Sequence, residues 1–178
     1  MRVLALSAIL AVLPASQGQA RLLLTQSQAL GLAFPAGTAV ERRTAYLSGP
    51  QVEKVQALAK AKLDSKVWTY YVGVASGAVV GTAYFDRVVV RTMPATLMAA
   101  VDADGSLKFL EVLTFDEPED YRAGPRWLAQ LRGRRLGADL RVGGVLRNMA
   151  GATLTSAALA DSARRMLAIH AVLNVGAP

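Results

Sequence analysis

The chain has 178 residues, with 20 Lys and Arg, 13 Asp and Glu, one histidine and no cysteine. This length corresponds to one domain, and a hydrophobic fraction of 53% excludes a disordered chain. The lack of cysteine excludes disulfides and cysteine-ligated metals, and the single histidine, His170, excludes multi-histidine metal sites and leaves little room for a Ser-His-Asp triad.

Residues 1–20 have the pattern of a secretory signal peptide. Arg2 gives the N-terminal region a positive charge, an apolar run follows at 3–13, and small residues precede a predicted cleavage site after Ala20. The apolar run is too short to span a bilayer. We therefore expect an exported, periplasmic mature chain, 21–178, that forms a single domain without a membrane span. The alternative is a buried N-terminal helix.

Two helices are predicted before the first strand. Thr25 is the expected N-cap of a short helix that stops at Pro35. Ser48 and Gln51 form the expected capping box of a second helix, which carries apolar residues on one face over about 49–66.

Short segments rich in Val, Thr, Tyr and Phe then predict four or five strands, at 67–74, 79–86, 88–93, 96–103 and 107–115. Ser76-Gly77 and Asp104-Gly105 are turn signals between them. Connections this short permit only antiparallel pairing. Helical patterns return at 125–133 and 156–173. The sequence therefore predicts an α+β fold, an antiparallel meandering sheet flanked by helices.

Positive charge is concentrated in one stretch of the chain. Without Arg2 there are 19 basic and 13 acidic residues, and the excess of six lies within 122–147, where seven arginines accompany only Asp139. Such a concentration of positive charge attracts a phosphate or an acidic partner protein. The alternative is that these arginines form an ordinary solvated face without a partner. Nucleic acid is a poor candidate, because the few aromatic residues do not interleave with the arginines.

A turn of small and hydroxyl-bearing residues precedes the last predicted helix, Gly151-Ala152-Thr153-Leu154-Thr155-Ser156. Free backbone N–H groups and the positive end of the helix dipole favour a phosphate group at such a place, and small residues let it approach closely. The alternative is that Thr155 or Ser156 simply caps the helix and nothing binds.

This segment resembles the flavinylation motif of FMN-binding domains, which include the C subunit of the sodium-translocating NADH:quinone reductase and the G subunit of the Rnf complex. The family pattern is Asp-x-x-Ser/Thr-Gly-Ala-Thr-x-Thr/Ser, in which a flavin transferase uses FAD to attach FMN through its phosphate to the Thr of Gly-Ala-Thr. The resemblance implies that Thr153 is the acceptor, with Thr155 as the alternative. Arg147 and Ala150 replace the Asp and the Ser/Thr of the pattern, so non-covalent FMN binding and a flavin-free chain stay open.

The resemblance extends upstream, where Glu117, Trp127 and Gly133 hold positions that match the family. The expected cofactor-binding residues are the covalent acceptor Thr153 together with Gly151, Ala152, Leu154, Thr155, Ser156, Arg147, Glu117, Trp127, Tyr84 and Met93. For the aromatic residues and Met93 the alternative is a place in the core, and for Glu117 it is an exposed loop. We interpret His170 as a core histidine or one in the last helical turn.

The resemblance implies an exported flavoprotein that carries electrons through FMN between a membrane or periplasmic redox partner and another acceptor. An electron carrier is expected rather than a turnover enzyme, since no substrate pocket is evident in the sequence. The alternatives are a flavin-dependent surface reductase of a small molecule and a flavin-free basic module that docks an acidic partner.

Overall fold

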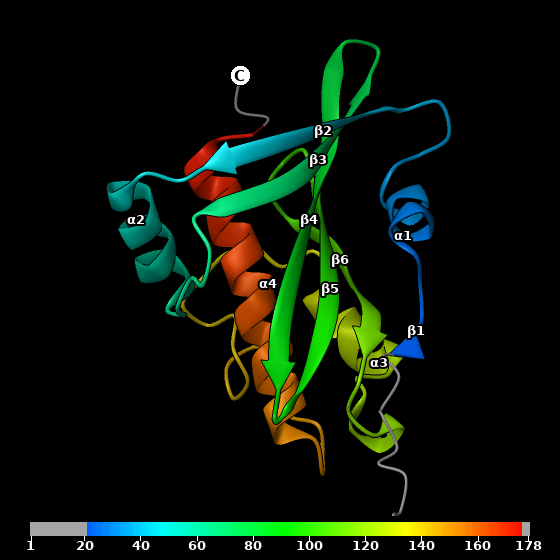
Figure 1. Cartoon of the computed structure of the whole chain (residues 1–178), viewed down its shortest axis with the longest axis vertical. Coiled ribbons are helices and arrows are strands. Elements are labelled where there is room, and N and C mark those ends of the chain that lie inside the picture. Colours follow the sequence, from blue (N-terminus) through cyan, green and yellow to red (C-terminus); the bar gives the residue numbers. More distant parts are fainter. Residues whose placement is uncertain (1–20, 176–178) are drawn as a thin grey trace, which may run out of the picture.

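The computed structural model describes residues 21–175, and the predicted signal peptide lies outside the described residues. An antiparallel sheet with the strand order β1-β6-β5-β4-β3-β2 packs against one long helix, α4 (Figure 1). The predicted α+β fold with a meandering sheet and flanking helices is therefore confirmed. Among residues 21–175, no helix has the length and apolar character needed to cross a membrane.

The structure places its elements in the following order: β1 (Arg21–Leu22), α1 (Gln26–Ala33), β2 (Ala39–Tyr46), α2 (Gly49–Ala59), β3 (Val67–Ala75), β4 (Ala78–Val90), β5 (Met93–Asp102), β6 (Leu107–Phe115), the 3₁₀ turn η1 (Glu119–Tyr121), α3 (Pro125–Leu128), the 3₁₀ turn η2 (Ala129–Leu131) and α4 (Thr153–Leu173).

Both predicted N-caps of the first two helices are confirmed. Thr25 and Ser48 each form a capping box with the glutamine three residues later. Helix α2 ends at Ala59, so its predicted extension to about residue 66 is wrong. Lys60 adopts a left-handed conformation with φ 47°, and the Gln56 side chain accepts a hydrogen bond from the Leu63 N–H (3.1 Å), which turns the chain out of the helix.

Strand β2 is the one strand of the meander that the sequence did not predict. Its residues are exposed on both faces except for the partly buried Ala45, so they show no alternation of apolar and polar side chains. The strand forms the outer edge of the sheet, where it pairs with β3 from Ala39 opposite Val74 to Tyr46 opposite Val67.

The segments 79–86 and 88–93 were predicted as separate strands, which is wrong. Strand β4 continues through both to Val90, and the chain turns at Arg91 and Thr92 before β5. Arg91 takes the left-handed φ of 55° that such a turn requires, although no glycine marks it in the sequence. The turns predicted at 76–77 and 104–105 are present.

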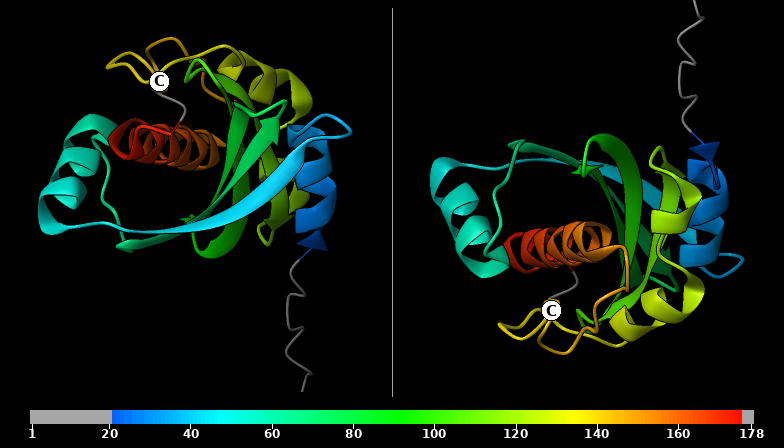
Figure 2. Two further views of the ribbon diagram at one scale, coloured as in Figure 1. Left: turned by 90° about the horizontal axis from the view of Figure 1, so that it is seen from above. Right: turned by 90° about the horizontal axis from the view of Figure 1, so that it is seen from below.

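The sheet curves around α4, with α2 on the same side and α1 on the opposite face (Figure 2). The main core lies between the sheet and the helices α2 and α4, and it includes Leu97, Leu159 and Met166. A smaller core, with Phe34 and Met98, lies between α1 and the outer face of the sheet. This packing fixes the long axis of α4 relative to the β4–β5 hairpin.

Two neighbouring arginines of α4 are largely buried and differ in their partners. Arg165 donates from Nη2 (2.8 Å) and Nε (3.1 Å) to Oδ2 of Asp86, which also accepts from the Ser162 hydroxyl (2.8 Å). Arg164 is only 4% exposed, and its Nε and Nη2 atoms have no hydrogen-bond partner among the described residues. Unlike Arg165, Arg164 therefore buries two guanidinium nitrogens without a hydrogen bond to any described residue, which is unfavourable.

Candidate functional site

Helix α4 begins at Thr153, three residues earlier than predicted. The first helical hydrogen bond runs from the Ser156 N–H to the Ala152 carbonyl (3.1 Å), so Ala152 is the N-cap. The alternative that Thr155 or Ser156 caps this helix is therefore wrong, because both residues lie inside it and are buried. Gly151 has a φ of +75°, which lets the chain turn into the helix at low cost.

The first turn of α4 has backbone donors that the protein leaves unused. No acceptor from the described residues reaches the N–H groups of Thr153, Leu154 and Thr155, and Ala152 offers no capping side chain. The Thr153 side chain is exposed, and Leu154 is 58% exposed beside it. The Thr155 side chain is completely buried, and its Oγ1 has no partner among the described residues.

Asn148 connects the loop before α4 to the first turn of the helix. Its Nδ2 donates to Thr153 Oγ1 (2.8 Å), while its Oδ1 accepts from the Met149 N–H (2.9 Å) and the Ser156 hydroxyl (2.6 Å). Asn148 is not among the site residues predicted from the sequence. The only available signal was an asparagine five residues before Thr153, a residue type that often bonds to nearby backbone.

An open cavity of about 540 Å³ lies beside this loop. The Trp127 Nε1 donates to the Arg147 carbonyl (2.7 Å), and the Arg147 N–H donates to Gln130 Oε1 (2.8 Å), so the loop is attached to α3 and η2. The structure thus brings Trp127 and Arg147 together with Asn148, as neighbours of the start of α4. The cavity is lined by Gly124, Arg126, Trp127, Gln130, Arg147, Asn148, Met149 and Ala150.

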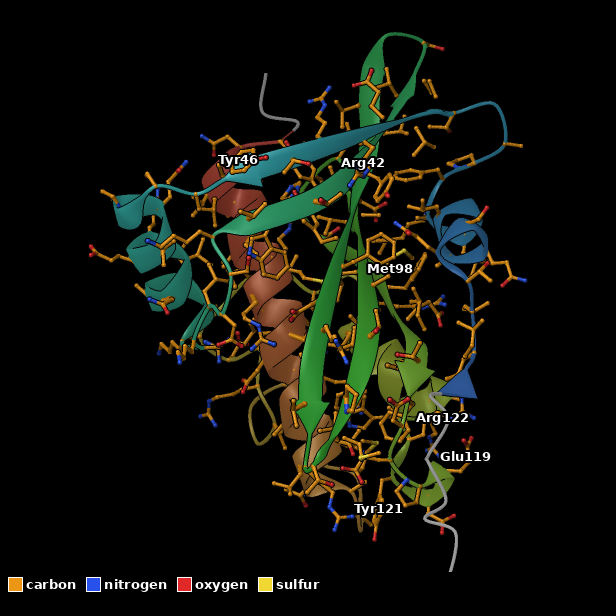
Figure 3. The ribbon with its side chains drawn as sticks, viewed as in Figure 1. Arg42, Tyr46, Met98, Glu119, Tyr121 and Arg122 are labelled. Atoms are coloured by element: carbon orange, nitrogen blue, oxygen red, sulfur yellow. The ribbon has the colours of Figure 1, made fainter. Side chains whose placement is uncertain are left out.

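A second open cavity, of about 520 Å³, lies between the first turns of α4 and the end of β4. Leu154 and Arg91 both line it, which places the tip of the β4–β5 hairpin close to the start of α4. The Arg91 guanidinium stacks over the Tyr121 ring at 4.3 Å, and Tyr121 marks this end of the molecule in Figure 3. The remaining lining residues are Asp64, Arg87, Val88, Val89, Ala158, Asp161 and Arg165.

Glu117 holds the turn between β4 and β5. Its Oε1 accepts hydrogen bonds from the Thr92 N–H (2.8 Å), the Thr92 hydroxyl (3.1 Å) and the Met93 N–H (3.0 Å). Glu117 is only 8% exposed, so it is not the exposed loop acid considered as an alternative. These hydrogen bonds lower the pKa of the Glu117 carboxyl below its ordinary 4.5, and the bond from the Thr92 N–H has the largest effect.

We expect Glu117→Gln to lower stability at neutral pH and to have little effect in acid. The folded-state pKa is lower than the unfolded one, so the carboxylate stabilises the fold above about pH 4.5, and this contribution is lost as the pH falls through the folded-state pKa. Urea unfolding of both proteins at several pH values measures the difference, with Glu53→Gln on the exposed face of α2 as control. A stability gap that stays constant from pH 7 to acid would contradict the role of the carboxylate charge.

Tyr84 lies away from the start of α4, contrary to the prediction that it forms a wall of the site. It is completely buried, stacks on Tyr70 at 5.5 Å, and its hydroxyl is 3.2 Å from His170 Nδ1. His170 is 17 residues from Thr153, about 25 Å along the helix axis at 1.5 Å per residue. Its Nδ1 is also 3.0 Å from the Thr82 hydroxyl, and burial lowers the pKa of the imidazole. His170 is therefore a core histidine, which is one of the two positions predicted for it from the sequence.

The arginines of 122–147 lie on the surface and differ in their pairing. Arg122 pairs with Glu119, and both are labelled in Figure 3, while Arg135 pairs with Asp104. Within the described part of the chain, five of these arginines have no carboxylate within 4.0 Å: Arg126, Arg132, Arg134, Arg141 and Arg147. Arg126 and Arg147 line the cavity beside Trp127, so uncompensated positive charge borders the start of α4.

Comparison of the sequence with protein-family models gives no match, and comparison with curated proteins gives none either.

Proposed function

We propose that this protein is an exported electron-transfer flavoprotein that carries FMN through a phosphoester to Thr153. The observation that carries the proposal is the exposed Thr153 hydroxyl on the first residue of a long helix whose N-terminus has no side-chain cap. The Gly-Ala-Thr resemblance names the same residue. One negative charge on Thr153 would lie at the positive end of the α4 dipole, where it is favoured.

The residues around Thr153 fit a flavin phosphate. Three unused backbone N–H groups, of Thr153, Leu154 and Thr155, are the kind of donors that hold phosphate oxygens at a helix start. A Cβ built on Gly151 would meet no atom within 4 Å, so the turn has open space on that side. Arg147 borders the same place and offers a guanidinium for a charge-assisted hydrogen bond.

Space for a flat aromatic ring is available next to this phosphate site. The cavity of about 540 Å³ has Trp127 in its wall, and exposed Leu154 lines the second cavity at the helix start. When bound, FMN supplies the redox chemistry itself. The chain has to hold its phosphate, shield one face of its ring and leave an edge open to a partner.

The proposal is tested by producing the chain with and without a flavin transferase. With the enzyme we expect a yellow protein whose intact mass is higher by one FMN less one water, and without the enzyme the unmodified mass. The modified peptide should contain Thr153. A colourless protein of unmodified mass, made beside a transferase that labels its own partner in the same cells, would overturn the proposal.

A second candidate function is a flavin-free docking module for an acidic protein. Arg126, Arg141 and Arg147, which have no carboxylate partner among the described residues, favour it. The same experiment separates the two functions, because only a folded and colourless protein from transferase-containing cells supports the docking module. Its binding to an acidic protein should then weaken as salt increases.

A further inference from the structure

The orientation of the Asn148 amide follows from its contacts. The Met149 N–H can only donate a hydrogen bond, so the Asn148 atom that faces it at 2.9 Å is the oxygen Oδ1. The Ser156 hydroxyl approaches the same oxygen at 2.6 Å. The amide nitrogen therefore faces Thr153 Oγ1, at 2.8 Å, and donates to it.

This contact has a definite consequence for the Thr153 hydroxyl. Oγ1 accepts the hydrogen bond from Asn148, which restrains the rotation of the side chain about its Cα–Cβ bond. The hydroxyl keeps its own proton and a second lone pair. Because Thr153 is exposed, both can face a molecule that approaches from solvent.

The backbone that carries Asn148 is itself held on both sides. Before it, the Arg147 carbonyl and N–H are bonded to Trp127 and Gln130. After it, the Met149 carbonyl accepts from the Ala152 N–H at 3.1 Å. A side chain on an anchored backbone places the atom that it contacts more accurately than one on an unattached loop does.

We propose that Asn148 is the positioning residue for flavin attachment at Thr153, an inference that rests on the proposed function. In the attachment step Thr153 Oγ1 forms a bond to the flavin-side phosphorus of FAD, and the bond from that phosphorus to the bridging oxygen of the diphosphate breaks. AMP leaves with the bridging oxygen, and the hydroxyl proton passes to a base of the transferase. Asn148 holds Oγ1 in the orientation from which it attacks, so its loss lowers the rate of the step.

The test measures the initial rate of attachment with purified chain, transferase and FAD, followed by intact mass. Asn148→Ala is expected to reduce the rate at saturating chain by tenfold or more, the scale of a misplaced reacting group, with little change in the KM for the chain. Asn148→Asp is expected to recover much of this loss, because one carboxylate oxygen still accepts from Met149 and Ser156 while the other accepts from the Thr153 hydroxyl. A residue that only stabilised the loop would not give this division between rate and KM.

Gln28→Ala is the matched control. The Gln28 amide oxygen accepts from the Thr25 hydroxyl (3.0 Å) at the start of α1, so its loss breaks a contact between an amide side chain and a threonine at a different helix. We expect this variant to be labelled at the wild-type rate. Ser156→Ala removes one contact of the Asn148 oxygen, together with the contact of the Ser156 hydroxyl to the Thr153 carbonyl (2.9 Å), and leaves the Thr153 side chain in place. It should give a smaller reduction than Asn148→Ala.

The outcomes separate the two proposals. If the wild-type chain is not labelled at all, the proposed function and the role of Asn148 fail together. If the wild-type chain is labelled and Asn148→Ala is labelled equally fast, only the role of Asn148 fails. It also fails if Gln28→Ala loses as much rate as Asn148→Ala, or if Asn148→Ala does not fold and Ser156→Ala keeps the wild-type rate.

Discussion

Alanine at position 153 is expected to abolish flavin attachment, whereas valine at position 155 is expected to leave it intact. Both residues are threonines of the same motif, and the sequence left both open as acceptors. They differ in accessibility, because Thr153 is exposed while Thr155 is completely buried within α4. A transferase can bring FAD only to a hydroxyl that solvent reaches, so the attachment should depend on Thr153 alone.

Intact mass and peptide mapping after co-expression with the transferase measure this difference. Thr153→Ser, which keeps a hydroxyl at the same place, should retain the full mass increase. Thr155→Val removes a buried hydroxyl that has no partner among the described residues, so it should not lower stability appreciably. A Thr153→Ala chain that still gains one FMN would exclude Thr153 as the acceptor, and loss of labelling in Thr155→Val would point to the other threonine.

Local sequence signals were sufficient for much of the fold. Capping boxes at Thr25 and Ser48 and the turns at 76–77 and 104–105 depend on residues within a few positions of each other, and all four are present. The short connections between strands left antiparallel pairing as the only arrangement. These features were predictable because the residues that stabilise them are the same neighbouring residues that form the sequence pattern.

The elements that the sequence did not predict depend on distant partners. The turn at Arg91 and Thr92 contains no glycine, and it is held by Glu117, a residue 25 positions away from Thr92. Strand β2 has no buried face to impose a period of two, and only its pairing with β3 makes it a strand. Tyr84 was assigned to the site by residue type, but its partner His170 lies near the other end of α4.

A turn of small residues before the last helix was predicted from the sequence, and Gly151 and Ala152 form it, whereas Thr153 already belongs to α4. Trp127 and Arg147 lie beside this turn. The motif position where the resembling family has an acid is Arg147, whose backbone contacts Trp127 and Gln130 in this structure. The next residue, Asn148, contacts the Thr153 hydroxyl and so connects this loop to the first turn of α4.

Methionine in place of Arg165 should destabilise the fold strongly, while methionine in place of Arg164 should stabilise it. Arg165 neutralises Asp86, and the two side chains are only 14% and 9% exposed. Removing one partner of such a pair leaves a buried charge uncompensated, which costs about 3–5 kcal/mol of the free energy of unfolding. Arg164 is 4% exposed and lacks partners for Nε and Nη2 in the described chain, so an apolar side chain of similar length removes a penalty. The expected gain is about 1–3 kcal/mol, the cost of leaving buried hydrogen-bond donors without partners.

Urea unfolding at neutral pH measures both effects, with Arg43→Met as control for the loss of a surface pair. Arg43 bonds to Glu41 on the exposed strand β2, where both side chains are about half exposed, so this variant should change stability by less than about 1 kcal/mol. The three substitutions remove the same group, and only burial and pairing distinguish them. A loss at Arg164 as large as that at Arg165 would mean that the Arg164 guanidinium has a partner in solution, and it would refute the expected gain.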